Sequence, residues 1–446
     1  MNKTKELAAL FSVSLLAACG GGGNSETGNS GGNNGGATVI LTADIIQETV
    51  CGTSVTASSA ELLVHNTDWS ISSRHKADSN GKISATIPAT TNANISLISS
   101  YGTGADRSIR VLSYAQHPTG DLGTLAVPGF TQQGCECQKT DVVVSSPVGA
   151  LNQQYVQLTG YYGEIESKST LAYNEVLFSG VTICRATGGD WPVLVAASSE
   201  PNNMVAGSTR NYNMSQQVSL SLQHDAIPYP ITLNAFDISL RQTHFTENGS
   251  IVSAVQPPYS DIHVYNELDG AELIVVNASR NNIEYIDGIS IWQRESQRSS
   301  YKLPLTEQLS ATVPDNTAQL ALQDFLVTGL LSDNTNYNLG TINGFNTFYL
   351  YAQTTLTDGT YYSQSFFGPL QGSYPDEIVP DDYNIEDKFD DNAAVLFEAS
   401  VIRDGDNQSY QQYLSSRVKR SKLAINERFS GEWAKFNTVS VQFSTQ

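Results

Sequence analysis

The sequence predicts an all-β protein: two or three consecutive β-sandwich domains that follow a disordered tether, with few short helices. Three observations lead to this prediction. The chain is rich in Thr, Ser, Val, Asn and Gln, and only 15% of its residues are charged while 9% are aromatic. Short runs of alternating apolar residues recur, and no run keeps the period of an amphipathic helix. Turn signals containing Gly, Asn or Pro separate several of these runs.

The N-terminus predicts export and a lipid anchor. Residues 7–18 are apolar or small and follow Lys3 and Lys5. As a helix they would rise about 18 Å, well short of the roughly 30 Å hydrocarbon core, so residues 1–18 suit a signal peptide better than a membrane span. Leu16-Ala17-Ala18-Cys19 resembles the lipobox of bacterial lipoproteins. That resemblance implies cleavage before Cys19, which becomes the lipidated first residue of the mature chain.

Residues 19–37 are expected to be the lipid anchor and a flexible tether. Residues 20–37 contain nine glycines and no large apolar side chain, so they cannot contribute to a core. Eighteen flexible residues span about 24 Å. Gly20 is not the Asp that retains lipoproteins in the inner membrane, so the lipoprotein resemblance implies the outer membrane, on its periplasmic or its external side.

The first β-domain is expected over residues 38–128. Asp78-Ser79-Asn80-Gly81 is a turn signal, and Ile83, Ala85 and Ile87 alternate as in a half-buried strand, with 95–98 expected as its neighbour. Over residues 60–100 this pattern resembles the transthyretin-like, or carboxypeptidase-regulatory-like, β-sandwich repeat. Members of that family are mostly non-catalytic spacers or binding modules, so the resemblance carries over no functional residues.

Two further β-domains of immunoglobulin-like or transthyretin-like type are expected over 129–255 and 256–372. The second boundary is placed at Pro257-Pro258, because consecutive prolines cannot join a β-ladder. Residues 373–446 then form an acidic segment and C-terminal strands. Within them, a helix is predicted around 409–420, and the alternation of Val439, Val441 and Phe443 predicts a strand.

Four cysteines besides Cys19 predict two disulfides, since the count is even in an exported chain. A bond between Cys135 and Cys137 would close a strained small ring. We therefore expect Cys51 to bond one of these two residues and Cys184 to bond the other, which would make the first two domains one rigid unit. A thiolate metal site is the alternative, but no histidine stands at zinc-like spacing.

The charge and the acidic segments limit the partners. A formal net charge of −20 disfavours nucleic acid and anionic lipid headgroups. Residues 376–391 are expected to form a solvent-exposed loop pinned by a few buried apolar side chains. Pairing with the basic run 417–422 and calcium binding are the alternatives. The calcium candidates are Asp381, Asp382, Asp387, Asp390, Asp391, Asp404 and Asp406.

No catalytic residue is predicted. The sequence lacks a metalloprotease helix motif, a serine-hydrolase elbow, a P-loop and a dinucleotide fingerprint. The six histidines show no metal-ligand spacing and are expected at the surface or in turns. We expect the aromatic residues to fill β cores, and exposed ones could instead stack on sugars. They include Tyr161, Tyr162, Tyr349, Tyr351, Tyr361, Tyr362, Phe366, Phe367, Trp191, Trp292 and Trp433.

These patterns predict a lipid-anchored outer-membrane or cell-surface lipoprotein that acts as a non-catalytic binding or structural module. The alternative is an exported glycan-active enzyme or its accessory carbohydrate-binding subunit. The membrane, through the lipid on Cys19, is the expected partner, with a glycan or another envelope protein as a further partner. No cofactor is expected apart from the covalent lipid, with calcium as the alternative.

Overall fold

The computed structural model describes residues 37–446 except 105–106, 162, 201–202, 236, 247–248, 256–260, 266–267, 269–270, 287–288, 307, 316, 330–334, 376–378, 391–392, 408, 424–426 and 446. Strands account for 58% of the structure, and the described residues include two α-helices. The prediction of an all-β protein is therefore confirmed. The signal peptide, Cys19 and most of the tether lie outside the described residues.

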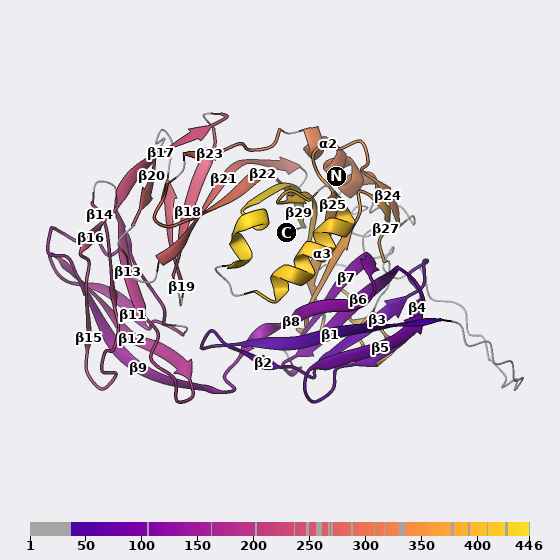
Figure 1. The fold of residues 1–446 in the computed structure, drawn as a ribbon, viewed down its shortest axis with the longest axis horizontal. Helices are drawn as coiled ribbons and strands as arrows, with labels where there is room; N and C mark the ends of the chain where they lie inside the picture. The colour runs from indigo at the N-terminus through magenta and orange to yellow at the C-terminus, as the bar shows by residue number, and fades with distance from the viewer. Residues whose placement is uncertain are drawn as a thin grey trace, which may run out of the picture.

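Residues 38–131 form two packed layers of strands (Figure 1). The strands are β1 (Thr38–Thr49), β2 (Ser54–Thr56), β3 (Ala60–His65), β4 (Ile71–Lys76), β5 (Lys82–Pro88), β6 (Asn92–Tyr101), β7 (Ser108–Pro118) and β8 (Asp121–Thr131). The predicted turn before β5 is present, because Asp78 Oδ1 accepts hydrogen bonds from the backbone N–H groups of Asn80 and Lys82, each at 2.8 Å. Ile83, Ala85 and Ile87 are buried as predicted.

The expected pairing of that strand with 95–98 is wrong. β5 pairs with β1, whereas β6 pairs with β3 and β7 in the opposite layer. The chain between β5 and β6 crosses from one layer to the other. Apolar alternation identifies each strand, but it cannot tell which of the two layers a strand enters.

The next strands form a second sandwich. They are β9 (Cys135–Ser145), β10 (Val156–Thr159), β11 (Ser167–Ala172), β12 (Glu175–Ala186), β13 (Leu194–Glu200), β14 (Asn203–Thr209), β15 (Val218–Ser221) and β16 (His224–Asp225). They build two four-stranded sheets, ordered β11-β12-β9-β15 and β10-β13-β14-β16. Their inward side chains, among them Val142, Phe178 and Leu194, form one hydrophobic core.

The rest of the chain is built around a long hairpin formed by β21 and β22. The strands of this part are β17 (Ile227–Leu233), β18 (Ser239–Thr246), β19 (Gly249–Val255), β20 (Asp261–Val264), β21 (Ala271–Ile286), β22 (Ile289–Lys302), β23 (Leu309–Ala311), β24 (Asn336–Asn338), β25 (Thr347–Thr355), β26 (Tyr361–Gly368), β27 (Gln371–Ser373), β28 (Val395–Asp404) and β29 (Lys435–Thr445). The helices are α2 (Thr317–Asp324), followed by a π-helical turn at Phe325–Gly329, and α3 (Tyr410–Ser421). Short 3-10 turns lie at Asp381–Tyr383, Glu386–Lys388, Glu427–Phe429 and Gly431–Trp433.

One twelve-stranded sheet joins distant parts of the described chain, in the order β19-β18-β21-β22-β29-β28-β25-β26-β7-β6-β3-β4. β29 lies between β22 and β28, and β7 pairs with β26 in parallel. This sheet runs across the expected boundaries at 255/256 and 372/373. The boundaries were placed from local proline and composition signals, and such signals do not indicate which strands pair over long distances.

Two disulfides are present, one between the first part of the structure and the second sandwich and one within that sandwich. Cys51 bonds Cys135, and Cys137 bonds Cys184, with Cα–Cα distances of 5.9 and 4.1 Å. This confirms that Cys51 and Cys184 each bond one member of the 135/137 pair. The first bond ties the end of β1 to the start of β9, and the second joins directly opposed residues of β9 and β12. Disulfides of this kind indicate an oxidising, extracytoplasmic compartment.

The acidic segment lies against the sheet. Val379, Tyr383, Ile385 and Phe389 pack on a core that includes Ile98 and Val111. This matches the expectation of a loop pinned by a few apolar side chains, although Ile378 lies outside the described residues. In the part of the chain that the structure describes, neither helix is long and apolar enough to cross a membrane.

Candidate functional site

The twelve-stranded sheet presents two different faces. In Figure 1, α3 lies inside the arc formed by β22, β29, β25 and β7, so we call this side the inner face. α2 packs on the outer face, where Ala318 and Leu322 join a core with Phe348, Val439 and Val441. Because side chains alternate along a strand, neighbouring residues point to opposite faces.

α3 forms because its first turn is capped and one stripe of it is apolar. Ser409 Oγ accepts a hydrogen bond from the backbone N–H of Gln412 at 3.3 Å, which satisfies a free donor of the first turn. Tyr410, Tyr413 and Leu414 are buried on one side of the helix. Lys419 and Arg420 lie in the last turn, where positive charge is favoured by the helix dipole. The predicted helix around 409–420 is confirmed.

α3 and the turn that follows it cover one end of the inner face. The ring of Tyr413 stacks near that of Phe367, with centroids 6.2 Å apart, and the guanidinium of Arg417 lies 4.5 Å from the centroid of the Tyr114 ring. Trp433 Nε1 donates a hydrogen bond to Ser416 Oγ at 3.1 Å. These contacts are aromatic and buried, so this end belongs to the core.

Beyond α3, four side chains stand in one line across four adjacent strands. Tyr351 on β25 is opposite Glu398 on β28, Glu398 is opposite Gln442 on β29, and Gln442 is opposite Trp292 on β22. We call these four residues the inner row. Trp292 is 44% exposed, and the other three are partly exposed. Three strand spacings of about 4.8 Å separate the backbone positions of Tyr351 and Trp292 by about 14 Å.

Hydrogen bonds fix the tyrosine end of the inner row. The hydroxyls of Tyr351 and Tyr361 both donate to Gln353 Oε1, at 2.6 and 2.7 Å. The Tyr349 ring lies nearly parallel to that of Tyr351, with centroids 6.4 Å apart. Burial raises the pKa of Tyr351 and raises that of Tyr349 to about 12, so both hydroxyls remain protonated at neutral pH. These contacts hold this end of the row in place.

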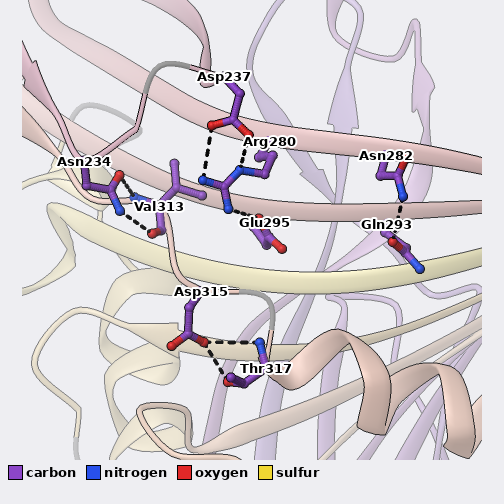
Figure 2. Close-up of polar contacts among 9 residues, drawn as sticks. All are labelled: Asn234, Asp237, Arg280, Asn282, Gln293, Glu295, Val313, Asp315 and Thr317. Atoms are coloured by element: carbon purple, nitrogen blue, oxygen red, sulfur yellow. Dashed lines mark hydrogen bonds and ion pairs between the residues drawn. The ribbon is translucent and has the colours of Figure 1, made fainter.

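A second polar cluster lies on the outer face (Figure 2). Arg280 on β21 extends between Asp237, which precedes β18, and Glu295 on β22. Its Nε lies 2.7 Å from Asp237 Oδ2 and its Nη1 lies 3.1 Å from Glu295 Oε2. We call these three residues the outer clasp. Glu295 is 1% exposed, and burial raises the pKa of its carboxyl while Arg280 offsets part of this rise.

The polar groups around the outer clasp are also paired within the protein. Asn234 exchanges two hydrogen bonds with the backbone of Val313, at 3.0 and 3.1 Å, and Asp315 Oδ1 accepts from the N–H and hydroxyl of Thr317 (Figure 2). The Asp315 contact caps the start of α2. Arg280 fills the space between the carboxylates of Asp237 and Glu295. The clasp therefore fastens the segment before β18 to β21 and β22 and is a structural contact.

The calcium candidates are dispersed. Asp404 is fully buried and pairs with Arg420, its Oδ2 lying 2.7 Å from Nη1, and burial raises the pKa of this carboxyl. Asp382 pairs with Arg74 at 3.0 Å. Asp381 lies with Asp382 in one 3-10 turn, while Asp387, Asp390 and Asp406 lie in other turns, and Asp391 is outside the described residues. Among the described residues, no group of three or more His, Cys, Asp or Glu is placed to hold a metal ion.

The basic run 417–422 finds partners outside the acidic segment. Arg420 pairs with Asp404 on β28, and Lys422 pairs with Asp121 at the start of β8. The described ion pairs therefore do not support the alternative that this run faces residues 376–391. Asp404 lies in the twelve-stranded sheet and Asp121 in the sheet of β1, β2, β5 and β8, so the basic residues fasten the helix to both sheets.

Three histidines are buried, which corrects the expectation that all six lie at the surface or in turns. His65 is held by Trp69 O at 2.9 Å and Ser96 Oγ at 2.8 Å. His117 is 2% exposed and His244 is fully buried. Burial disfavours the imidazolium and lowers the pKa of His117 and of His244 to about 4. All three stand on strands, where a single polar residue gives no sequence signal of burial.

The aromatic residues divide between buried and partly exposed positions. Tyr362, Phe366 and Trp433 are buried, and Trp191 is partly buried with Arg185 against its ring, the guanidinium lying 4.3 Å from the centroid. Tyr162 lies outside the described residues. Tyr351, Tyr361 and Trp292 remain partly or largely exposed on the inner face.

No protein-family model matches this chain, and no curated protein is significantly similar to it. The inner face must therefore be interpreted from its own geometry.

Sequence reasoning named Tyr351 and Trp292 but missed Glu398 and Gln442. Gln442 lies within the alternation that predicts the last strand, at a position that the pattern marks as facing away from Val441 and Phe443. What the sequence could not supply is the order of strands. Only the register of β25, β28, β29 and β22 brings the four residues of the row into line.

Proposed function

We propose that this protein is a lipid-anchored lipoprotein of the outer membrane that acts as a non-catalytic binding module, with the inner row as its ligand-binding face. The observation that carries the proposal is the row itself. Four aromatic or planar polar side chains stand on adjacent strands, partly exposed, beside a helix that covers one end of the face. A sheet with this many hydrogen-bonded neighbours holds them rigidly, which lowers the entropic cost of binding.

The outer clasp supports this choice by contrast. Its charges pair with one another and its most buried member, Glu295, is almost inaccessible, so a ligand there would have to compete with the ion pairs. The side chains of the inner row are partly exposed and form no ion pair among the described residues. A ligand there could displace water without breaking a buried ion pair.

Support for the anchor comes from the sequence and from the disulfides. The lipobox-like Leu16-Ala17-Ala18-Cys19 predicts lipidation of Cys19, and Gly20 predicts sorting to the outer membrane. The Cys51–Cys135 and Cys137–Cys184 bonds agree with export. In this proposal the strands of residues 38–131 act as a transthyretin-like spacer, and the tether holds them away from the membrane.

The anchor is tested by Cys19→Ser. The unchanged chain should incorporate labelled palmitate and fractionate with outer membranes, whereas the variant should be soluble or remain as uncleaved precursor. Membrane-bound variant of mature size would contradict the lipoprotein assignment.

The binding face is tested with the soluble Cys19→Ser chain. It should be retained by at least one surface in a panel of immobilised glycans, matrix proteins and envelope fractions. A Trp292→Ala/Tyr351→Ala double variant should lose that retention, while Tyr173→Ala, a change at a tyrosine that is 77% exposed elsewhere, should keep it. Equal retention of all three proteins would show that the inner row is not the binding face.

A further inference from the structure

We infer that the inner row binds an uncharged oligosaccharide laid across the strands, with Tyr351 and Trp292 as stacking platforms and Glu398 and Gln442 as hydrogen-bonding groups between them. The inference rests on the proposed function, because it names the ligand class for the same face.

The two rings provide flat apolar surfaces at both ends of the row. Trp292 leaves 44% of its surface exposed on a central strand, although an indole of this size usually gains by being covered. Ile283, directly opposite Trp292 on β21, is also exposed and extends the apolar surface. Tyr351 is fixed by the hydrogen bond from its hydroxyl to Gln353. The apolar C–H faces of sugar rings can cover such rings while their hydroxyls remain free to bond at the edges.

The side chains between the rings match the hydroxyls of a sugar. A carboxylate accepts hydrogen bonds at two oxygens, and an amide both donates and accepts. Glu398 Oε1 already accepts from Ser400 Oγ at 2.8 Å, which orients the carboxylate on the face. Glu398 and Gln442 stand directly opposite each other, so they could bond neighbouring hydroxyls of one chain.

The charges around the row favour an uncharged ligand. Arg110 and Arg294 lie exposed on the same face as Glu398, so the local charges are few and mixed. The whole chain carries a formal net charge of −20, which repels polyanions such as acidic polysaccharides and nucleic acids. A neutral glycan is not repelled by the net negative charge and needs no charged partner on the face.

The distance between the rings sets the ligand's length. Platforms about 14 Å apart along the sheet cannot both be covered by one sugar unit. Affinity should therefore rise with chain length until one molecule covers Tyr351 and Trp292 together. α3 closes the neighbouring part of the face, so the chain has to run across the strands along the row.

The test is calorimetric titration of the soluble Cys19→Ser chain with cellohexaose, maltohexaose, xylohexaose, mannohexaose and chitohexaose, and with the shorter members of any series that binds. One series should bind, with affinity rising from disaccharide to hexasaccharide. Trp292→Ala and Tyr351→Ala should each weaken binding about tenfold or more, and Tyr173→Ala should leave it unchanged. Near-ultraviolet dichroism of each variant confirms that its tertiary packing is intact.

The inference is overturned if none of the five hexasaccharides binds at millimolar concentration, or if binding survives both substitutions at full strength. In that case, retention on the mixed panel that still depends on Trp292 and Tyr351 leaves the proposed function standing with a protein or charged ligand. If binding does not depend on the inner row in either experiment, both the inference and the assignment of the inner row as the binding face are wrong.

Discussion

The outer clasp and the inner row lie on opposite faces of the same strands and use polar residues for opposite purposes. On the outer face, Arg280 neutralises Asp237 and the buried Glu295, and the cluster holds two segments together. On the inner face, Glu398 and Gln442 stand partly exposed between two aromatic rings. Burial separates the two cases: a charge that has lost water must be paired within the protein, whereas a charge that keeps water can exchange that water for a ligand.

Lowering the pH should have the largest effect on stability, because it protonates one buried histidine on each face of the sheet. His117 points to the inner side and His244 to the outer side, and the pKa of each falls to about 4 in the fold. Because the unfolded chain binds a proton near pH 6.5 and the folded chain does not, stability is lost as the pH falls below about 6.5. At pH 4.5 each residue should account for about 2.5 kcal/mol.

Urea unfolding at pH 7 and pH 4.5 measures this loss. His117→Gln and His244→Gln should each reduce the difference between the two pH values, and His75→Gln, on the edge strand β4, controls for removal of one imidazole. A pH dependence identical in all variants would show that neither histidine is held neutral.

Removing the cation of the outer clasp should have the next largest effect. Arg280→Ala leaves Glu295 buried without a counter-charge, which should lower the free energy of unfolding by about 3 kcal/mol. The matched control is Arg241→Ala, an exposed arginine on the neighbouring strand β18, which should change stability by about 0.5 kcal/mol or less. Chemical denaturation of both variants at pH 7 makes the comparison, and similar losses in the two would mean that the clasp is not structural.

Removing the negative charge of Glu295 should lower the free energy of unfolding much less. The raised pKa of Glu295 means that the fold disfavours its charged form even with Arg280 beside it. Glu295→Gln keeps the shape and removes that penalty, so its stability at pH 7 should lie within about 1 kcal/mol of the unchanged protein. A loss as large as that of Arg280→Ala would show that the ion pair more than repays the burial of Glu295.

The smallest stability effect is expected at the inner row. Gln442→Ala removes a partly exposed side chain from a strand that stays fully paired, so it should shift the free energy of unfolding by roughly 0.5 kcal/mol or less. Thermal unfolding by circular dichroism is sufficient to measure this. A large loss would give Gln442 a structural role and would move the row from the binding side of the comparison to the structural side.

The sequence was most informative where structure depends on neighbouring residues. The turn at 78–81, the strand after it, the helix around 409–420 and the last strand were predicted from alternation, turn residues and spacing, and all are present. Cysteine parity and ring strain predicted that Cys51 and Cys184 bond different members of the 135/137 pair.

Prediction failed where structure depends on pairing between distant segments. The proline-rich break near 257 does not end a sheet, because β18 before it pairs both with β19 and, across the break, with β21. The inner row could not be predicted for the same reason, because only the pairing of β28 with β29 places Glu398 opposite Gln442. Burial of His117 and His244 was missed for a related reason, because only the assembled layers exclude water from them.

The central place of β29 has a consequence for the timing of folding. This strand, residues 435–445, lies between β22 and β28. In the described sheet, the half built on β21 and β22 and the half that contains β25 and β7 therefore pair only through it. A chain that emerges from a translocation channel N-terminus first delivers this strand long after the disulfide-linked strands have appeared. Until then, two incomplete sheets present open edges, which are prone to wrong pairing. We therefore expect the arrival of β29 to be the closing step of assembly, and it is the step at which a chaperone would have the most to protect.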